Sequence, residues 1–336
     1  MRTRKMWLFW LPIALTASAL SLPLAAPARV DTGPAGNAVG VVQYPIPKAN
    51  TRPYSIVAGP DGNLWFTEST IGAIGRITPS GVITQFALPD PKSNPYGITR
   101  GADGNLWFTE RLADRIGKIT PSGVITEYPV LTPNSQPWDI TALPDGTLWF
   151  TEENADQIGR IDQAGNVTEY PAGEGTLPTH ITTGPDGNIW YTEELGNHIV
   201  RLNPGNPSER TRFPLLTDGA LPWDITTGPD GNLWFTTLAA RLIGKITPAG
   251  VVTEYTVPGD FGIAGIAAGP DGRMWFTEND SGQVGSITVG GQVGAERFTT
   301  GSYPFGITAG PDRNMWFAVG FGNAIGKLRF IQKSSG

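Results

Sequence analysis

The sequence Gly101-Ala-Asp-Gly-Asn-Leu-Trp-Phe-Thr-Glu110 decides the fold, because close copies of it return along the whole chain. Aligned on the tryptophan, successive copies are 41 to 44 residues apart. The seven aligned tryptophans are Trp65, Trp107, Trp149, Trp190, Trp234, Trp275 and Trp316. A period of this length with several short strands per unit is typical of propeller blades. The sequence therefore predicts an all-β, seven-bladed β-propeller.

Each unit predicts four strands. In the second unit these are Pro95–Thr99, Asn105–Glu110, Ile116–Thr120 and Val124–Tyr128. The Gly-Pro-Asp-Gly and Pro-Ser-Gly groups between such segments are turn sequences, because Pro fixes φ, Asp bonds its own backbone and Gly accepts positive φ. The apolar Leu-Trp-Phe run is typical of a strand covered on both faces. We therefore expect the tryptophan rings to lie between blades.

The ring closure is also predicted by the repeat. The last unit ends at Ile325–Phe330 and lacks its fourth strand, whereas Val41–Tyr44 matches that missing strand. Pairing the two would remove an open sheet edge. We therefore expect a propeller over residues 41–330, closed by its N-terminal strand, and a short tail over residues 331–336.

The N-terminal segment has the pattern of an export signal. Basic residues 1–5 are followed by an apolar stretch over residues 6–24 and by Ala26-Pro27-Ala28. This order predicts a secretory signal peptide over residues 1–28, then a flexible linker over 29–40. The protein is accordingly expected to be secreted or held at the cell surface. Membrane association is expected only if the signal remains uncleaved, because its apolar stretch is nearly long enough to span a bilayer.

Composition excludes several classes of function. The 336 residues include no Cys and only two His, which excludes disulfide scaffolds, thiol nucleophiles and His-rich metal cages. The net charge is −6 and there is no basic run outside the N-terminal segment, so a nucleic-acid partner is not expected. We expect a monomer.

The first strand of each blade begins where the second ends, at one mouth of the central channel. The position two residues before the isoleucine of that first strand is aromatic in five blades. Across the blades it reads Tyr54, Tyr96, Trp138, Thr179, Trp223, Ala264 and Phe305. We predict a ligand-binding rim of rings, open on the side of the small Thr179 and Ala264; the alternative is that the rings simply seal the channel.

At the next position of the first strand, three blades have an ionisable residue that the other blades lack. This position reads Asp139, His180 and Asp224 in three consecutive blades, but Ser or Gly elsewhere. These three are the candidate catalytic residues, with His180 as a general base whose pKa the carboxylates would raise. The alternative is that they bond to backbone at the strand entry. Adjacent strand residues face opposite ways, so rings and carboxylates are not expected to share the channel.

A glutamate follows Trp-Phe-Thr in five blades. The set is Glu68, Glu110, Glu152, Glu193 and Glu278. Carboxylates gathered at one mouth would bind Mg²⁺ or Ca²⁺, and Glu152 and Glu193 are the candidate ligands. Because the glutamate recurs, the alternative is a hydrogen bond from blade to blade. His198 lies in a turn and is expected to be solvated.

The repeated Gly-Pro-Asp-Gly-Asn-Leu-Trp-Phe-Thr-Glu and Ile-Gly-Arg-Ile-Thr-Pro units over residues 41–330 resemble the virginiamycin B lyase, or streptogramin lyase, family. This resemblance implies a seven-bladed propeller that linearises cyclic depsipeptide antibiotics by Mg²⁺-assisted elimination. It also implies a His where this chain has Ala264, and a Glu and a His where it has Tyr303 and Phe305. A carboxylate implied after the final Trp-Phe-Ala is replaced by Val319.

Three functions follow from these observations. The first is a propeller with little or no lyase activity that binds a small cyclic peptide, a glycan or a protein at the channel mouth. The second is a Mg²⁺-dependent lyase of streptogramin B or a related depsipeptide. The third is a lactonase-like hydrolase. Because the positions that the resemblance assigns to catalysis are not filled, the sequence favours the first.

Overall fold

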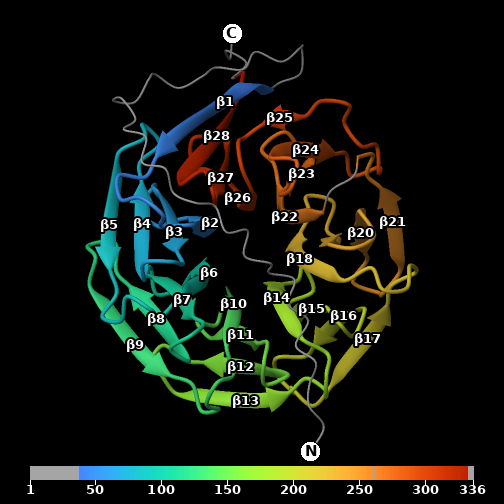
Figure 1. The fold of residues 1–336 in the computed structure, drawn as a ribbon. Coiled ribbons are helices and arrows are strands. Elements are labelled where there is room, and N and C mark those ends of the chain that lie inside the picture. Colours follow the sequence, from blue (N-terminus) through green and yellow to red (C-terminus); the bar gives the residue numbers. More distant parts are fainter. Residues whose placement is uncertain (1–37, 260–261, 332–336) are drawn as a thin grey trace, which may run out of the picture.

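The computed structural model describes residues 38–259 and 262–331, which form a ring of seven four-stranded antiparallel sheets (Figure 1). The predicted all-β, seven-bladed propeller is confirmed. In each blade the first strand lies innermost and the fourth outermost (Figure 1). Over the described part of the chain, no helix is long and apolar enough to cross a membrane.

The first four blades follow the chain in order. Blade one has β2 (Pro53–Ala58), β3 (Leu64–Glu68), β4 (Ala73–Ile77) and β5 (Ile83–Ala87). Blade two has β6 (Pro95–Arg100), β7 (Leu106–Glu110), β8 (Arg115–Ile119) and β9 (Ile125–Pro129). Blade three has β10 (Pro137–Ala142), β11 (Leu148–Glu152), β12 (Gln157–Ile161) and β13 (Val167–Pro171). Blade four has β14 (Pro178–Thr183), β15 (Ile189–Glu193), β16 (His198–Leu202) and β17 (Arg210–Pro214).

The last three blades complete the ring. Blade five has β18 (Pro222–Thr227), β19 (Leu233–Thr237), β20 (Leu242–Ile246) and β21 (Val252–Thr256). Blade six has β22 (Ile263–Ala268), β23 (Met274–Glu278), β24 (Gln283–Ile287) and the short β25 (Phe298–Thr299). Blade seven has β26 (Pro304–Ala309), β27 (Met315–Val319), β28 (Ala324–Phe330) and, as its outermost strand, β1 (Ala38–Pro45).

The N-terminal strand closes the ring as predicted. β1 pairs with β28 in antiparallel register, with Val41 opposite Leu328 and Tyr44 opposite Ile325. β1 begins at Ala38, so the boundary expected between linker and propeller lies three residues too late. The predicted signal peptide and the rest of the linker lie outside the described residues.

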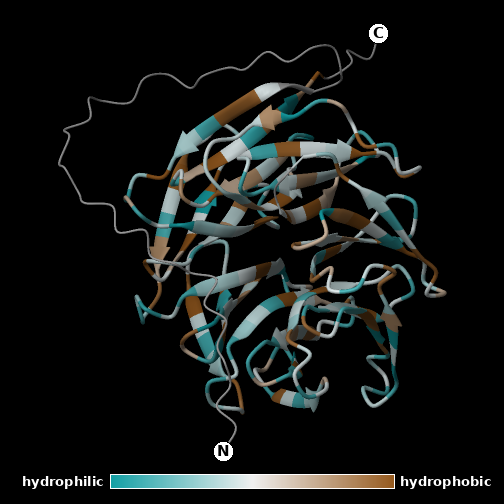
Figure 2. Ribbon diagram, turned by 45° about the vertical axis from the view of Figure 1, so that its right-hand side comes forward, coloured by the Kyte–Doolittle hydropathy of each residue, from teal (hydrophilic) through white to brown (hydrophobic). Residues whose placement is uncertain are grey.

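The repeated tryptophans fill the space between blades. Trp149 of blade three is fully buried against Ile189 and Tyr191 of the next blade, and Trp316 packs in the same way against Phe66 of blade one. In Figure 2 brown, hydrophobic segments alternate with white and teal ones along the strands of the blades. The hydrophobic core is therefore a series of seven interfaces, and the channel inside them is left free to carry other residues.

Candidate functional site

A β-bulge at the start of each inner strand shapes the channel mouth. In blade three, Pro137 pairs with Glu152 and Ile140 with Phe150, so that Trp138 and Asp139 together face the single residue Thr151. Both Trp138 and Asp139 consequently line the central cavity, which has a volume of about 230 Å³. The expectation that adjacent positions would face opposite ways is wrong here, because the bulge interrupts the strand alternation.

A belt of threonines holds these bulges in place. The Oγ1 of Thr151 accepts the backbone N–H of Asp139 at 3.1 Å and donates to the carbonyl of Thr179 in the next blade at 2.5 Å. The same two bonds are made by Thr67, Thr109, Thr192, Thr236 and Thr277. Blade seven has Ala318 instead and cannot make this link to blade one.

Five rings meet at this end of the channel, and we call them the aromatic cap. Its members are Tyr54, Tyr96, Trp138, Trp223 and Phe305. The ring centroids of Tyr54 and Tyr96 are 4.1 Å apart, and those of Trp138 and Trp223 are 5.5 Å apart. The cap joins rings from five blades, which favours the alternative that they seal the channel. Trp223 and Phe305 remain partly exposed, so they are the rings able to stack on a ligand.

Of the two small residues of the rim, Ala264 lines the cavity and Thr179 does not. Thr179 is fully buried and its hydroxyl bonds to Thr192 Oγ1 at 2.9 Å, so it turns away from the cavity. The imidazole of His180 lies beside the cap instead, 4.9 Å from the ring of Trp223. The predicted ligand-binding position of Thr179 is therefore occupied, on the cavity side, by the neighbouring His180.

The two aspartates bind backbone, as the alternative interpretation held. Asp139 Oδ2 accepts the N–H of Ile181 in blade four at 3.2 Å. Asp224 Oδ2 accepts the N–H of Ile266 in blade six at 2.8 Å. Burial raises the pKa of each carboxyl to about 7, and the charge of Asp139 contributes to the raised pKa of Asp224.

His180 does not have the raised pKa that was predicted for a general base. Burial lowers its pKa to about 3, only partly opposed by a bond to the carbonyl of Trp223. Neither neighbouring carboxylate contributes to the pKa of His180. Near neutral pH the imidazole is uncharged, and its Nδ1 atom has no hydrogen-bond partner.

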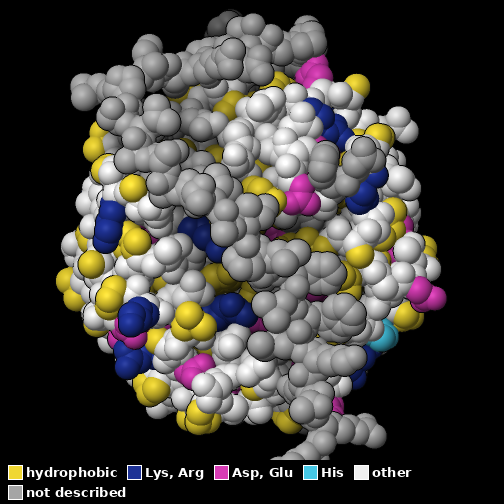
Figure 3. Space-filling view, viewed as in Figure 1, with side chains coloured by type: hydrophobic (Ala, Val, Ile, Leu, Met, Phe, Trp, Pro, Cys, Tyr) yellow, Lys and Arg dark blue, Asp and Glu magenta, His cyan; other side chains and the backbone are white. Residues whose placement is uncertain are grey.

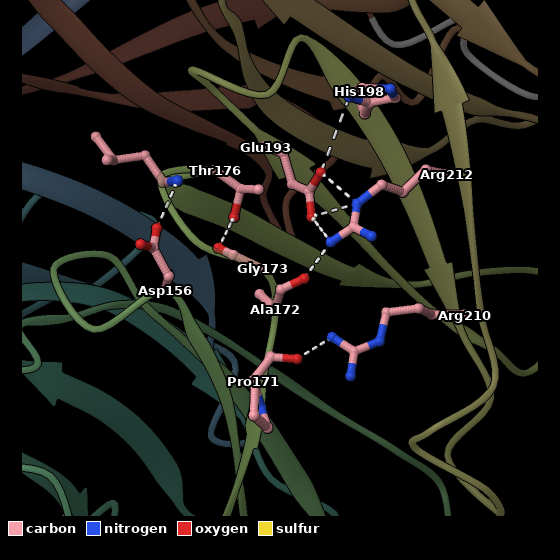
Figure 4. A network of polar contacts seen from close by, with 10 residues as sticks. Asp156, Pro171, Ala172, Gly173, Thr176, Glu193, His198, Arg210 and Arg212 are labelled. Carbon is pink, nitrogen blue, oxygen red and sulfur yellow. Dashed lines mark hydrogen bonds and ion pairs between the residues drawn. The ribbon is translucent and has the colours of Figure 1, made fainter.

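The repeated glutamates lie inside the blades rather than at the channel. Glu193 is fully buried, and its oxygens accept bonds from Nε and an Nη of Arg212 at 2.9 and 3.0 Å (Figure 4). Arg212 also donates to the carbonyl of Ala172. Glu68 and Glu278 likewise accept from residues of the outer part of their own blades, Gln85 and Arg297. The predicted blade-to-blade bond is therefore wrong for these three: they bind within one blade.

Glu152 and Glu193 do not fit a divalent cation. Neither lines the channel cavity, and the oxygens of Glu193 are already held by Arg212. Glu152 is buried, which raises its pKa to about 8 and favours the protonated carboxyl over an anionic ligand. Across the described part of the chain, no group of three or more His, Asp or Glu side chains is placed to hold a metal ion.

Three charged residues outside the cap were missed by the sequence analysis. The guanidinium of Arg111 lies 4.6 Å from the ring centroid of Trp138 and pairs with Glu153 at 2.8 Å. Burial, with the charge of Glu153, raises the pKa of Glu194 to about 7. All three directly follow the repeated glutamate, at a position that changes from blade to blade. That variation is the same signal that singled out Asp139, His180 and Asp224.

Charged and hydrophobic side chains lie side by side near the centre of the face seen in Figure 3. At the mouth itself, Arg111 over Trp138 is a pairing of this kind. Apolar rings beside a few convergent polar groups are the mixture that ligand-binding sites favour. The aromatic cap with Arg111, Glu153 and Glu194 is therefore the candidate site on the mouth. Rings of the cap also form one wall of the cavity that lies behind them.

Comparisons with known proteins agree with this architecture. The model of the virginiamycin B lyase family matches residues 28–206 and 172–333. A streptogramin B lyase structure is 34% identical with a TM-score of 0.82, covering 87% of this chain and 97% of that one. A catalytically inactive virginiamycin B lyase from Staphylococcus aureus with quinupristin is 34% identical with a TM-score of 0.81, covering 87% and 99%.

More distant structures share the fold alone. Hydrazine synthase from Kuenenia stuttgartiensis is 16% identical with a TM-score of 0.70, covering 87% of this chain and 98% of that one. No sequence match was found among curated proteins.

Proposed function

The chain belongs to the virginiamycin B lyase family, and from this premise we propose that it is a ligand-binding propeller with little or no lyase activity. Its ligand is a small cyclic peptide held on the aromatic cap. Fold alone does not decide between binding and turnover. The proposal therefore depends on which side chains occupy the positions where the family resemblance implies catalytic groups.

The observation that carries the proposal is the chemistry of these positions. Ala264 is almost fully buried, and its carbonyl accepts a bond from Thr236. Val319 is fully buried in an apolar cluster with Phe317 and Leu328. Phe305 is a member of the cap. None of Ala264, Val319 and Phe305 can move a proton or hold a metal, and an elimination without its base loses a factor of about 10²–10⁴ in rate.

The exposed parts of the cap support binding of a peptide-like ligand. Trp223 and Phe305 offer ring faces. The pair formed by Arg111 and Glu153 offers a hydrogen-bond donor and an acceptor beside Trp138 of the same cap. An aromatic side chain stacked on a ligand ring contributes roughly 1 kcal/mol beyond its buried area. A glycan or a protein would use the same rings, and these are the other outcomes of a binding experiment.

A Mg²⁺-dependent lyase is the second candidate, favoured by the identity with solved lyases. The residues present do not fit a Mg²⁺ ion, because Glu193 is bound to Arg212 and Val319 offers no ligand atom. The lactonase-like hydrolase is weaker still, since the repeated glutamates do not line the cavity.

The experiment is incubation of the protein with quinupristin, followed by mass spectrometry and chromatography. Intact substrate together with saturable binding, measured by calorimetry, is the expected result. A linear product of unchanged mass, lost on addition of EDTA, would establish the lyase instead. A product heavier by one water would establish the hydrolase. If quinupristin neither binds nor reacts, the cyclic-peptide ligand is wrong.

We also propose that the chain is exported through its N-terminal segment. The support is the basic, apolar and small-residue order of residues 1–28. Fractionation of cells that produce the full chain should place it outside the cytoplasm, shortened by about 28 residues. Full-length protein that stays in the cytoplasm would contradict this.

A further inference from the structure

The cavity behind the aromatic cap has a lining unlike the mouth. Its inner strands alternate, so that Asp139 and Thr141 face the channel while Ile140 between them packs between the blades. Further threonines line it along the same strands, namely Thr99, Thr182, Thr226 and Thr308. The cavity thus runs from the rings of the cap along the inner strands, with walls rich in hydroxyl and carboxyl oxygens.

Acidic groups in this cavity have no basic side chain beside them. Among the described residues that line it, there is no Lys or Arg. Asp139 accepts the N–H of Ile181 in the next blade on Oδ2. Asp224 accepts the N–H of Ile266 in the next blade on Oδ2 and that of its neighbour Ile225 on Oδ1. Both carboxyls are partly accessible, and the cavity is what they face. Two buried carboxylates without a counter-ion are costly, which a bound cation would relieve.

His180 supplies the second, independent observation. It lines the same cavity between the two aspartates in the blade order, only 9% of it is exposed, and its Nδ1 has no hydrogen-bond partner. Buried polar atoms are rarely left without a partner. A neutral imidazole has one nitrogen lone pair, which accepts a hydrogen bond from a donor such as N–H. Because the ring is uncharged, it does not repel a cation.

We propose that the central channel contains a binding site for a small ammonium ion or primary amine, formed by Asp139, His180 and Asp224. A cavity of about 230 Å³ accommodates such an ion and a few waters, and is too small for a cyclic peptide. The carboxylates neutralise the charge, and the carboxylate, imidazole and threonine acceptors receive its N–H bonds. This site lies behind the cap and does not depend on the proposed ligand of the mouth.

An ammonium ion fits these groups better than a metal ion. No set of three or more acidic or His side chains is close enough to coordinate a metal among the described residues. Hydrogen bonds to N–H groups tolerate larger separations and can pass through water. Burial raises the pKa of both carboxyls to about 7, so a bound cation would compete with protons for them.

The test uses methylammonium chloride as the probe and the whole secreted chain as the protein. Binding is measured by calorimetry and by the NMR signal of the probe's methyl group. We expect saturable binding to one site, with affinity rising between about pH 6 and about pH 8 as protons leave the carboxyls. Tetramethylammonium has no N–H group and should bind at least about tenfold more weakly.

The matched variants separate the channel from general charge effects. The double substitution Asp139→Asn and Asp224→Asn keeps an oxygen for the N–H groups of Ile181 and Ile266 and loses only the bond from the N–H of Ile225, so the fold is expected to survive. It should weaken methylammonium binding at least about tenfold. Asp218→Asn removes an acid from an exposed turn and should leave binding unchanged.

Three results would overturn the proposal. One is no saturable binding up to about 100 mM methylammonium. Another is equal binding by wild type and the folded double variant. The third is Mg²⁺ or Ca²⁺ binding with methylammonium excluded, which would assign a metal site. Because the proposed methylammonium ligands are Asp139, His180 and Asp224, which are not part of the proposed peptide site, failure here does not decide the outcome with quinupristin, and the reverse also holds.

Discussion

The interfaces between blades and the lining of the channel come from neighbouring positions of one repeat, yet they differ in uniformity. At the interfaces, Trp149 has its counterpart in every blade and Thr151 in all but one. In the lining, Asp139, His180 and Asp224 occupy a position that is Ser or Gly elsewhere. The difference shows that packing must repeat for the ring to close, whereas the channel is free to differ from blade to blade.

Some of the lining is nevertheless constrained by the interfaces. A Cβ on Gly97 would lie 2.7 Å from the Cα of Asp139, and one on Gly265 would lie 2.5 Å from the carbonyl oxygen of Phe305. At these junctions the next blade approaches closely, and only glycine fits. The polar residues of blades three to five therefore stand in the part of the ring where the backbone leaves room for side chains.

The largest effect is expected from removing the closing strand of blade seven. Deleting residues 1–46 removes β1 and exposes the edge of β28, which should lower the free energy of unfolding by more than about 5 kcal/mol or cause aggregation. The control is a chain that begins at Ala38 and keeps the strand. Urea unfolding of the two proteins measures the difference. Equal midpoints would mean that the closing strand β1 is dispensable.

A second comparison sets an interface ring against a channel ring. Trp149 is fully buried between blades, so Trp149→Ala should cost about 3–5 kcal/mol of stability. Trp223 is partly exposed in the cap, and Trp223→Ala should cost less than half as much while weakening ligand binding severalfold. Thermal unfolding and calorimetry test both. If Trp223→Ala destabilises as strongly as Trp149→Ala, the division between the two regions fails.

The threonine belt links the two regions, so its loss should have an intermediate effect. Thr151→Val keeps the shape but leaves the N–H of Asp139 and the carbonyl of Thr179 unpaired, at a cost of about 1–3 kcal/mol. Thr168→Val on the exposed outer strand of the same blade is the control. Denaturant unfolding that gives the same midpoint for both variants would show that the belt adds no stability.

The interfaces could be predicted from the sequence and much of the channel could not. Repetition identified Trp149, the four strands of each blade and the closing β1, because a residue present in every unit is under the same packing constraint. The bulge that turns both Trp138 and Asp139 to the cavity has no local sequence signal, since it depends on a hydroxyl twelve residues further along. The sequence suggested that Glu193 lies at the channel mouth. It lies inside the blade instead, because it binds Arg212 of the outer strand.

The pH dependence of stability should come from the channel rather than the interfaces. The folded protein raises the pKa of Asp139 and Asp224 to about 7, so their contribution is present below the unfolded pKa of about 4 and is lost as pH rises through about 7. Asp139→Asn should remove part of this loss, on the order of 1 kcal/mol after screening by channel water. Melting temperatures between about pH 5 and about pH 8 measure it.

His180 contributes with the opposite sign. Its pKa is lowered to about 3 in the folded protein, so its contribution is present above the unfolded pKa of about 6.5 and is lost as pH falls toward about 3. His180→Gln should therefore reduce the loss of stability on the acid side and leave the alkaline side unchanged. A variant that instead loses stability equally at every pH would show that packing, not titration, governs this residue.

The smallest effect is expected at His198, which belongs to neither region. Its Nδ1 lies 3.9 Å from Glu193 Oε2, but Arg212 already holds that carboxylate with shorter bonds (Figure 4). The imidazole is partly exposed, so it still contacts water but is not the freely solvated side chain that the sequence predicted. A contact of this kind contributes about 0–1 kcal/mol.

His198→Ala should therefore shift the urea midpoint little and leave ligand binding unchanged. Arg212→Ala leaves the buried Glu193 without its partner and should cost about 3–5 kcal/mol of stability. A large effect of His198→Ala would mean that the Glu193 network depends on the histidine, which the structure places at the start of β16 rather than in the predicted turn.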